Sequence, residues 1–198
     1  MLEKPLLLEG EPGTGKTKLA QEFAAHEKHR IYEVPITSES KISQLVSRFD
    51  EVQRLMDAQA AVANAQMKQA GIDMVIDTAG RRVDRLEEYV HFGPLANAFA
   101  NPGSVLLMDE IDKAPRELPN NLLFLLSERR IMIPETQQVI ECEPGKMPVI
   151  VITSNHEQDL PAPFIRRCIY MYIEFPVPER MREIVRMHHP EAQEKMVA

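Results

Sequence analysis

The chain has 198 residues, of which 44% are hydrophobic and 27% are charged, which predicts one soluble globular domain, and no apolar run approaches the length of a transmembrane helix. The formal net charge of −7 argues against nonspecific binding to nucleic acid, because such binding needs a basic surface. The two cysteines are too few for a disulfide framework, and the N-terminal sequence MLEKPLLL does not fit a signal peptide, so we expect a cytoplasmic protein.

Short apolar runs of strand length alternate with helical patterns along the chain. The predicted strands are, in order, Pro5–Leu8, Arg30–Val34, Ser104–Met108, Val149–Thr153 and Ile169–Phe175. The spacing of apolar residues predicts helices over Lys16–Lys28, Lys41 to about Ala70, and Arg116–Glu128. Strands that alternate with helices predict an α/β fold, in which a mainly parallel sheet carries helices on both faces.

The segment Ile72–Phe92 interrupts this alternation. Gly71 is suited to cap the long helix that precedes the segment. The segment contains two runs with some strand character, Met74–Ile76 and Tyr89–Phe92, on either side of a turn at residues 78–80. We interpret it as an insertion into the alternating pattern.

The first predicted strand is followed by the sequence GEPGTGKT, which fits the pattern G-x-x-x-x-G-K-[ST]. Its residues are Gly10, Glu11, Pro12, Gly13, Thr14, Gly15, Lys16 and Thr17. A loop of this kind turns backbone N–H groups inward, and the N-terminus of the next helix adds a partial positive charge, so that phosphate groups are bound. In this motif the lysine contacts the β- and γ-phosphates and the hydroxyl binds Mg²⁺. The sequence therefore predicts an ATP site that contains Lys16 and Thr17.

Acidic residues end the third predicted strand, in the sequence SVLLMDEID. Asp109 would hold Mg²⁺, and Glu110 would polarise the water that attacks the γ-phosphate. The alternatives for Glu110 are a solvated acid and a structural ion pair. Beside a phosphate loop, the adjacent Asp and Glu favour ATP hydrolysis over a small-molecule kinase, which transfers the phosphate to its substrate.

Polar and basic residues follow the fourth predicted strand. Asn155 would orient the attacking water or contact the γ-phosphate, and an ordinary turn residue is the alternative. Arg166 and Arg167 carry planar guanidinium groups that suit phosphate, and a surface ion pair is their alternative. In a doubly wound sheet these arginines would lie away from their own phosphate loop. They would therefore act on the nucleotide of a neighbouring subunit, as arginine fingers do.

These motifs, in this order, resemble those of AAA+ ATPases and, more narrowly, of the MoxR group. The resemblance extends over nearly the whole chain. Its main carriers are the stretches GPLANAF (Gly93–Phe99), VLLMDEIDKAPRELPNNLLFLLSE (Val105–Glu128) and TSNHEQDLPAPFIRRCIYMYIEFP (Thr153–Pro176), and SRFDEVQRLMDAQ (Ser47–Gln59) resembles one MoxR branch. The resemblance implies a three-layer P-loop NTPase fold with a mainly parallel, five-stranded sheet.

The resemblance also implies roles for the candidate site residues. Residues 10–17 would be the Walker A loop, Asp109 and Glu110 the Walker B pair, and Asn155 the sensor 1 residue. Arg166 and Arg167 fall where the finger arginines of the family lie, and the resemblance does not decide which of them acts.

Two further segments and the domain limits follow from the same resemblance. Ile131–Ile140 would form a hairpin before sensor 1, and Ile72–Phe92 would belong to the helix-2 insert, which faces the working surface of the ring. Residues 1–178 would form the nucleotide-binding αβ domain, and residues 179–198 would begin a helical lid that is largely missing. We therefore expect a fragment, a shortened form or a reduced member of the family.

Proteins of this group form rings, usually hexamers, which remodel partner proteins or insert cofactors into them. Their partners often contain a von Willebrand A-type domain. We expect the chain to bind ATP and Mg²⁺, to assemble with itself and to have no membrane partner. Two alternatives stay open, a non-catalytic nucleotide-binding assembly module and a DNA-processing AAA+ motor, although the acidic charge argues against the motor.

Overall fold

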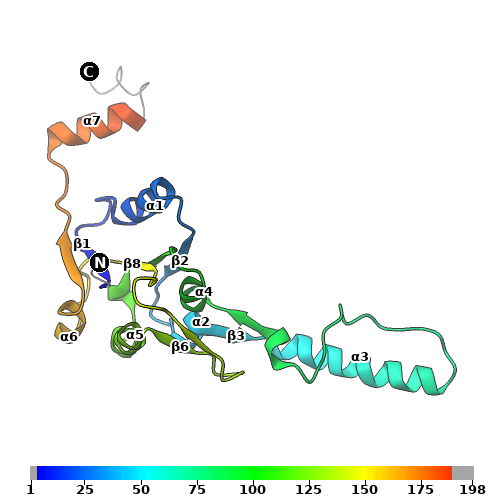
Figure 1. Ribbon diagram of the computed structural model, residues 1–198. Helices are drawn as coiled ribbons and strands as arrows, with labels where there is room; N and C mark the ends of the chain where they lie inside the picture. Colours follow the sequence, from blue (N-terminus) through cyan, green and yellow to red (C-terminus); the bar gives the residue numbers. More distant parts are fainter. Residues whose placement is uncertain (1–3, 189–198) are drawn as a thin grey trace.

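A five-stranded parallel sheet forms the centre of the molecule, which is described by a computed structural model for residues 4–188 (Figure 1). Its strands are β1 (Leu6–Glu9), β2 (Ile31–Pro35), β5 (Val105–Asp109), β8 (Val149–Ser154) and β9 (Ile169–Tyr172). They lie in the order β2-β5-β8-β1-β9, and every neighbouring pair is parallel. The five strands predicted from the sequence and the α/β fold are therefore confirmed.

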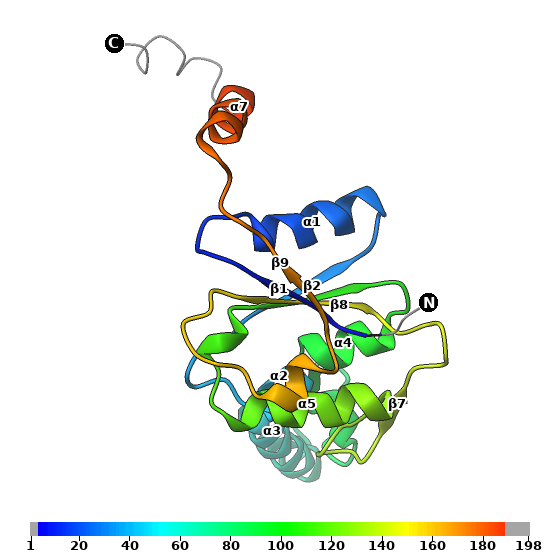
Figure 2. The same ribbon diagram turned by 90° about the vertical axis from the view of Figure 1, so that its left-hand side faces the viewer.

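Helices cover both faces of the sheet (Figure 2). Helix α1 (Lys16–His26) lies on one face, whereas α4 (Pro94–Ala100) and α5 (Glu117–Glu128) lie on the other, together with α2 (Ile42–Val46) and α6 (Ala162–Ile165). Alternate residues of β5 enter the two halves of the core. Leu106 and Met108 pack in the cluster that contains α4 and α5, and Leu107 packs against α1. This burial on both faces explains the continuous apolar sequence of β5.

The predicted helix from Lys41 to Ala70 is wrong in its first part. The structure divides that stretch into α2, a short strand β3 (Ser47–Phe49) and helix α3 (Glu51–Gln69). Strand β3 pairs antiparallel with β4 (Val90–Phe92), and the Asp50 side chain caps α3 by accepting a hydrogen bond of 2.9 Å from the Gln53 amide. Helical spacing did not reveal the break because the partner strand lies far along the chain. Gly71, with a φ of +71°, follows α3 in the left-handed conformation expected of a C-terminal cap.

Helix α3 and the chain that returns along it form an arm, residues 51–89, which projects from the domain (Figure 1). Residues 72–78 have no regular structure, so the strand character predicted for Met74–Ile76 is wrong, whereas β4 lies inside the predicted run Tyr89–Phe92. The 3-10 helix η1 (Leu86–Tyr89) precedes β4.

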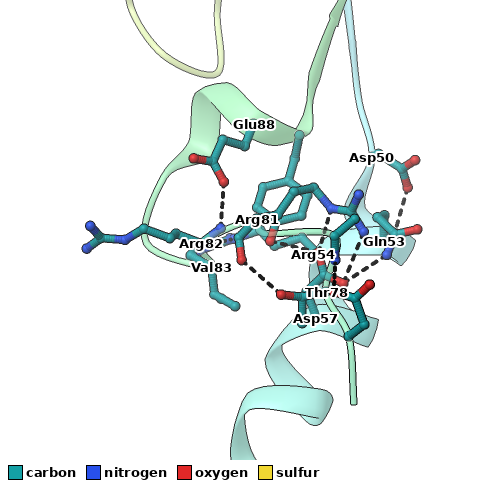
Figure 3. A network of polar contacts seen from close by, with 12 residues as sticks. Asp50, Gln53, Arg54, Asp57, Thr78, Arg81, Arg82, Val83 and Glu88 are labelled. Carbon is teal, nitrogen blue, oxygen red and sulfur yellow. Dashed lines mark hydrogen bonds and ion pairs between the residues drawn. The ribbon is translucent and has the colours of Figure 1, made fainter. Parts of the chain in front are cut away.

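A polar network ties the returning chain of the arm to α3 (Figure 3). The buried Asp57 carboxylate accepts hydrogen bonds from Arg81 Nε at 2.8 Å, Tyr89 Oη at 3.0 Å and Gln53 Nε2 at 2.9 Å. These bonds lower the pKa of Asp57, and the one from Arg81 has the largest effect. Further along, the Asn64 side chain exchanges two hydrogen bonds with the backbone of Ile76. These hydrogen bonds join the returning chain to α3 at two places along the arm.

The remaining elements agree with the expected order. Strands β6 (Arg130–Met132) and β7 (Val139–Glu141) form an antiparallel hairpin at the predicted position, and the 3-10 helix η2 (Ile111–Lys113) follows β5. Helix α7 (Pro178–His188) lies apart from the sheet, beyond an extended segment that follows β9 (Figures 1 and 2). Residues 189–198 of the predicted lid segment lie outside the described residues. Within residues 4–188, no helix is both long and apolar enough to cross a membrane.

Candidate nucleotide site

The glycine-rich loop joins the carboxyl end of β1 to α1, as the motif predicts. A Cβ atom at position 10 would collide with the carbonyl oxygen of Ile173, so this position needs glycine. Gly15 stands at the N-cap of α1 with a φ of +91°, a left-handed conformation that glycine adopts without strain. Both glycines thus serve the shape of the loop, at the expense of helix propensity.

Backbone and side-chain donors gather at the start of α1. The first hydrogen bond of the helical ladder runs from Leu19 N to Gly15 O, at 2.9 Å, so the amides of the preceding turn are not used within the helix. The buried Lys16 ammonium donates hydrogen bonds to the carbonyl oxygens of Gly10 at 2.8 Å and Glu11 at 2.9 Å. Burial lowers the pKa of Lys16, although the nearby carboxylates of Asp112 and Asp109 oppose this effect. The loop therefore places a cation beside amides that the helical ladder does not use, which suits a polyphosphate.

Asp109 is held by hydroxyl groups from two other segments. Thr17 Oγ1 donates a hydrogen bond of 2.8 Å to Asp109 Oδ1, and Thr153 Oγ1 donates one of 2.6 Å to the same oxygen. The Glu110 amide in turn donates to Thr153 Oγ1 at 2.8 Å. Thr153 was not singled out from the sequence. The sequence feature that could have revealed it is a hydroxyl residue at the carboxyl end of β8, the strand that lies between β1 and β5.

Glu110 contacts two side chains at the edge of the same site. Asn155 Nδ2 donates a hydrogen bond of 3.0 Å to Glu110 Oε1, and Lys113 Nζ forms an ion pair of 2.7 Å with Glu110 Oε2. The Glu110 backbone has a φ of +60°, which is strained for a residue with a side chain and is often found at functional sites. The structural ion pair that was the alternative for Glu110 is thus present. Its partner Lys113 was not predicted from the sequence.

Asp112 fixes the turn that carries Asn155. Its Oδ2 accepts hydrogen bonds from the amides of Asn155 at 3.1 Å and Glu157 at 2.9 Å. The side chain is almost fully buried, and its other oxygen has no hydrogen-bond partner among residues 4–188. Asp112 was also missed from the sequence, where it is simply the third acid of the run DEID. The Asn155 backbone is therefore held in place, and only its side chain is left to turn.

Five of the eight predicted Walker A residues, the Walker B pair and the sensor 1 residue line one hollow of about 290 Å³, whereas Gly10, Glu11 and Thr14 do not line it. Its lining residues are Pro12, Gly13, Gly15, Lys16, Thr17, Lys18, Asp109, Glu110, Thr153 and Asn155. The oxygens of Thr17 and Asp109 lie close enough together to serve one hard cation, so these residues fit Mg²⁺. The structure thus brings together hydrogen-bond donors for phosphate, oxygen ligands for Mg²⁺ and a carboxylate that could act as the general base.

Arg166 and Arg167 do not line the nucleotide hollow. The parallel pairing of β1 with β9 sets Leu6 beside Ile169, which places the preceding arginines level with the start of β1. The phosphate loop follows the other end of β1, roughly 15 Å away along the strand. Both arginines are exposed and line an apolar cavity of about 480 Å³, and neither makes an ion pair with another described residue. The expectation that they lie away from their own phosphate loop agrees with this placement.

Comparisons with known proteins agree with this arrangement. Residues 5–168 match the AAA domain (dynein-related subfamily). Protein NorQ of Paracoccus denitrificans (strain Pd 1222) is 26% identical over 185 residues, which covers 91% of this chain and 56% of NorQ. The crystal structure of a protein described as an ATPase, from Cytophaga hutchinsonii ATCC 33406, matches with a TM-score of 0.57 and 16% identity, over 96% of this chain and 48% of that one. The chain therefore spans about half the length of the relatives it matches, and the solved structure shows a shared fold.

The family match extends over most of the chain and includes the phosphate loop, the pair Asp109–Glu110 and Asn155. Domains of this family bind nucleotides and typically form oligomers. The motif order, the five-stranded parallel sheet and the family match agree with one another. The chain belongs to the dynein-related subfamily of AAA domains, which confirms its recognition as an AAA+ protein.

Proposed function

We propose that this chain hydrolyses ATP in the presence of Mg²⁺ and that hydrolysis drives the remodelling, maturation or cofactor insertion of a partner protein. One observation carries the proposal: Lys16, Asp109, Glu110 and Asn155 line the same small hollow at the carboxyl ends of adjacent strands. This is the edge of an open α/β sheet at which ligands bind.

Binding rests on the loop at residues 10–17. The amides at the start of α1, which the helical ladder does not use, and the Lys16 ammonium would hold the phosphates, and the helix N-terminus adds to their attraction. Thr17 and Asp109 would hold Mg²⁺, which would neutralise phosphate charge when bound. Thr153 would keep the Asp109 carboxylate in its orientation through the bond of 2.6 Å.

Hydrolysis needs a group that takes a proton from water and one that places the water. The Glu110 carboxylate would be the base, and the Asn155 amide, 3.0 Å from it, would orient the water or contact the γ-phosphate. The presence of a carboxylate at the hollow supports water rather than a second substrate as the acceptor.

Assembly would complete the site. Arg166 and Arg167 lie at the opposite end of the sheet from their own phosphate loop, and they are exposed without ion-pair partners among the described residues. A finger role for either one therefore requires a neighbouring subunit, in a ring that is a hexamer in the intact form. Residues 1–178 would be the unit that assembles, with the lid beginning at residue 179.

The surface of the arm, residues 51–89, supports the proposal that the chain contacts a partner protein. Helix α3 leaves four large apolar side chains more than half exposed, and three of them, Val52, Leu55 and Met56, stand at helical spacing in its first two turns; the fourth is Val62. Exposed apolar side chains gathered on a projecting element are typical of interaction sites. The family resemblance suggests a partner with a von Willebrand A-type domain.

Turnover and affinity separate the candidate functions. The purified chain is assayed for phosphate release from ATP and Mg²⁺, and ATP affinity is measured by calorimetry on the same sample. Turnover that disappears in Glu110→Gln supports hydrolysis by this site. Tight binding without turnover favours the non-catalytic assembly module, and strong DNA binding at physiological salt favours the DNA-processing motor.

A further inference from the structure

Strand β9 forms one edge of the central sheet, and among residues 4–188 it pairs only with β1 (Figures 1 and 2). Its four side chains, Ile169, Tyr170, Met171 and Tyr172, are between 40% and 51% exposed. The strand contains no charged residue and no proline, the two features that most often protect a sheet edge from further pairing. This edge is therefore open to another strand.

The opposite edge of the sheet, β2, is protected. The exposed Glu33 carries a charge in the middle of the strand, and the strand ends in Pro35, which has no amide hydrogen to donate. The Arg30 guanidinium also lies 5.3 Å from the centre of the Tyr32 ring. The sheet can therefore be extended at β9 but not readily at β2.

The backbone of β9 directs unused hydrogen-bonding groups outward. The amides of Ile169 and Ile173 donate to the carbonyl oxygens of Pro5 and Glu9, each at 2.7 Å, so these residues face β1. Backbone groups of successive residues in a strand alternate in direction. The amide and carbonyl groups of Tyr170 and Tyr172 therefore point away from β1, as donors and acceptors for a further strand.

We propose that β9 pairs antiparallel with β9 of a second copy of this chain. With the two-fold axis beside Met171, Tyr170 of each copy lies opposite Tyr172 of the other. Each of these two pairs exchanges both of its outward backbone hydrogen bonds, as closely spaced antiparallel pairs do. The two five-stranded sheets then become one continuous sheet.

Charge complementarity favours a second copy in this direction. Arg167 precedes β9 and Glu174 follows it, both are exposed, and neither forms an ion pair with another residue of the described range. Antiparallel pairing about Met171 sets Glu174 of one copy opposite Cys168 of the other, next to Arg167, and symmetry forms this contact twice. Parallel pairing in register would instead bring each charge beside its own equivalent.

The pairing gives a closed dimer rather than a chain of copies. A two-fold contact uses the same surface of both copies, and the protected edge at β2 cannot propagate it. One pair of short strands is a small interface, so we expect a weak dimer whose population rises with protein concentration. This contact goes beyond the proposed function, and it requires neither ATP nor hydrolysis.

Sedimentation velocity without nucleotide measures the dissociation constant of the dimer in the parent chain and in two matched variants. Met171→Lys sets two ammonium groups opposite each other at the axis, so the dissociation constant should rise roughly tenfold or more. Met132→Lys is the control, because Met132 is 53% exposed in strand β6, close to the 49% of Met171. It should leave the dissociation constant near the parent value, and circular dichroism checks that both variants fold.

Two exposed charges test the direction of pairing. Glu174→Lys and Arg167→Glu each bring like charges together, so each should raise the dissociation constant roughly threefold or more. An equal mixture of these two variants should dimerise nearly as well as the parent chain, since every contact then joins opposite charges. Glu174→Lys also tests the interface without relying on the Met171 variant to fold.

Three results would overturn the proposal. A parent chain that stays monomeric without nucleotide at every concentration forms no such pair, and its open edge then serves another partner or none. A dimer that folded Met171→Lys and Glu174→Lys both leave unchanged is joined through another surface. A mixture that dimerises no better than its two components rules out the antiparallel direction. Phosphate release from ATP is assayed separately, so none of these results bears on the proposed hydrolysis.

Discussion

The Thr17 hydroxyl donates a hydrogen bond of 2.8 Å to the Asp109 carboxylate, although the two residues are 92 positions apart in the chain. One stands in the first turn of α1 and the other ends β5. Their contact joins the phosphate loop to the acidic strand, and it places two oxygen ligands where one cation would bind both.

Thr17→Val keeps the shape of the side chain and removes its hydroxyl. We expect ATP affinity in the presence of Mg²⁺ to fall by roughly tenfold or more, because one cation ligand and the bond to Asp109 are lost. In EDTA the same substitution should change ATP affinity little. Calorimetric titration in the two conditions measures the difference. An equal loss with and without the metal would mean that Thr17 acts only through the loop.

Lys16→Ala removes the cation from the loop. We expect ATP affinity to fall by roughly a hundredfold, since charge-assisted bonds to phosphate are lost. The sheet should stay intact, because the Lys16 side chain bonds only to the loop carbonyls of Gly10 and Glu11 among the described residues. Calorimetry measures the affinity and circular dichroism the fold. Unchanged affinity in a folded variant would contradict the phosphate-loop assignment.

Glu110→Gln keeps the size of the side chain and removes its basicity. ATP should still bind, whereas hydrolysis should slow by roughly 10²- to 10⁴-fold, the usual contribution of a general base. Single-turnover phosphate release measures the chemical step directly. Hydrolysis at the parent rate would show that another group activates the water.

Because Arg166 and Arg167 lie away from their own phosphate loop, we expect catalysis to depend on assembly of the chain with itself. Specific activity should rise with protein concentration, and Arg166→Ala or Arg167→Ala should lower turnover more than ATP affinity, because a finger acts mainly on the transition state. A mixture of an arginine variant with Glu110→Gln should regain activity, since some interfaces combine an intact base with an intact finger. Turnover that is independent of concentration, together with no gain on mixing, would leave the arginines a structural role.

In the arm, we expect loss of the Asp57 network to change hydrogen exchange locally without affecting the nucleotide site. Asp57→Ala removes the acceptor shared by Arg81, Tyr89 and Gln53, so amides of the returning chain, residues 71–85, should exchange hydrogen roughly tenfold faster. ATP affinity should not change. Asp84→Ala, which removes an exposed ion pair with Arg82, is the matched control and should have a much smaller effect. Equal exchange in both variants would show that the Asp57 network does not fix the arm.

The sequence by itself determined the features that contiguous residues encode. The phosphate loop, the Asp-Glu pair and the Asn at the end of β8 follow apolar runs that are continuous because both faces of the sheet are covered. Since all five strands are parallel, their carboxyl ends meet at one edge, and the polar residues that follow β1, β5 and β8 could be placed together in advance.

Tertiary structure alone decided the contacts between distant segments. Antiparallel pairing of β3 with β4 breaks a helix that local spacing predicts, because its bonds to a distant strand replace those of the helical ladder. The register of β1 with β9 fixes the end of the sheet at which Arg166 and Arg167 lie. The backbone turn at Glu110 aims its carboxylate at Lys113 and Asn155, and no spacing in the sequence reports a left-handed residue that is not glycine.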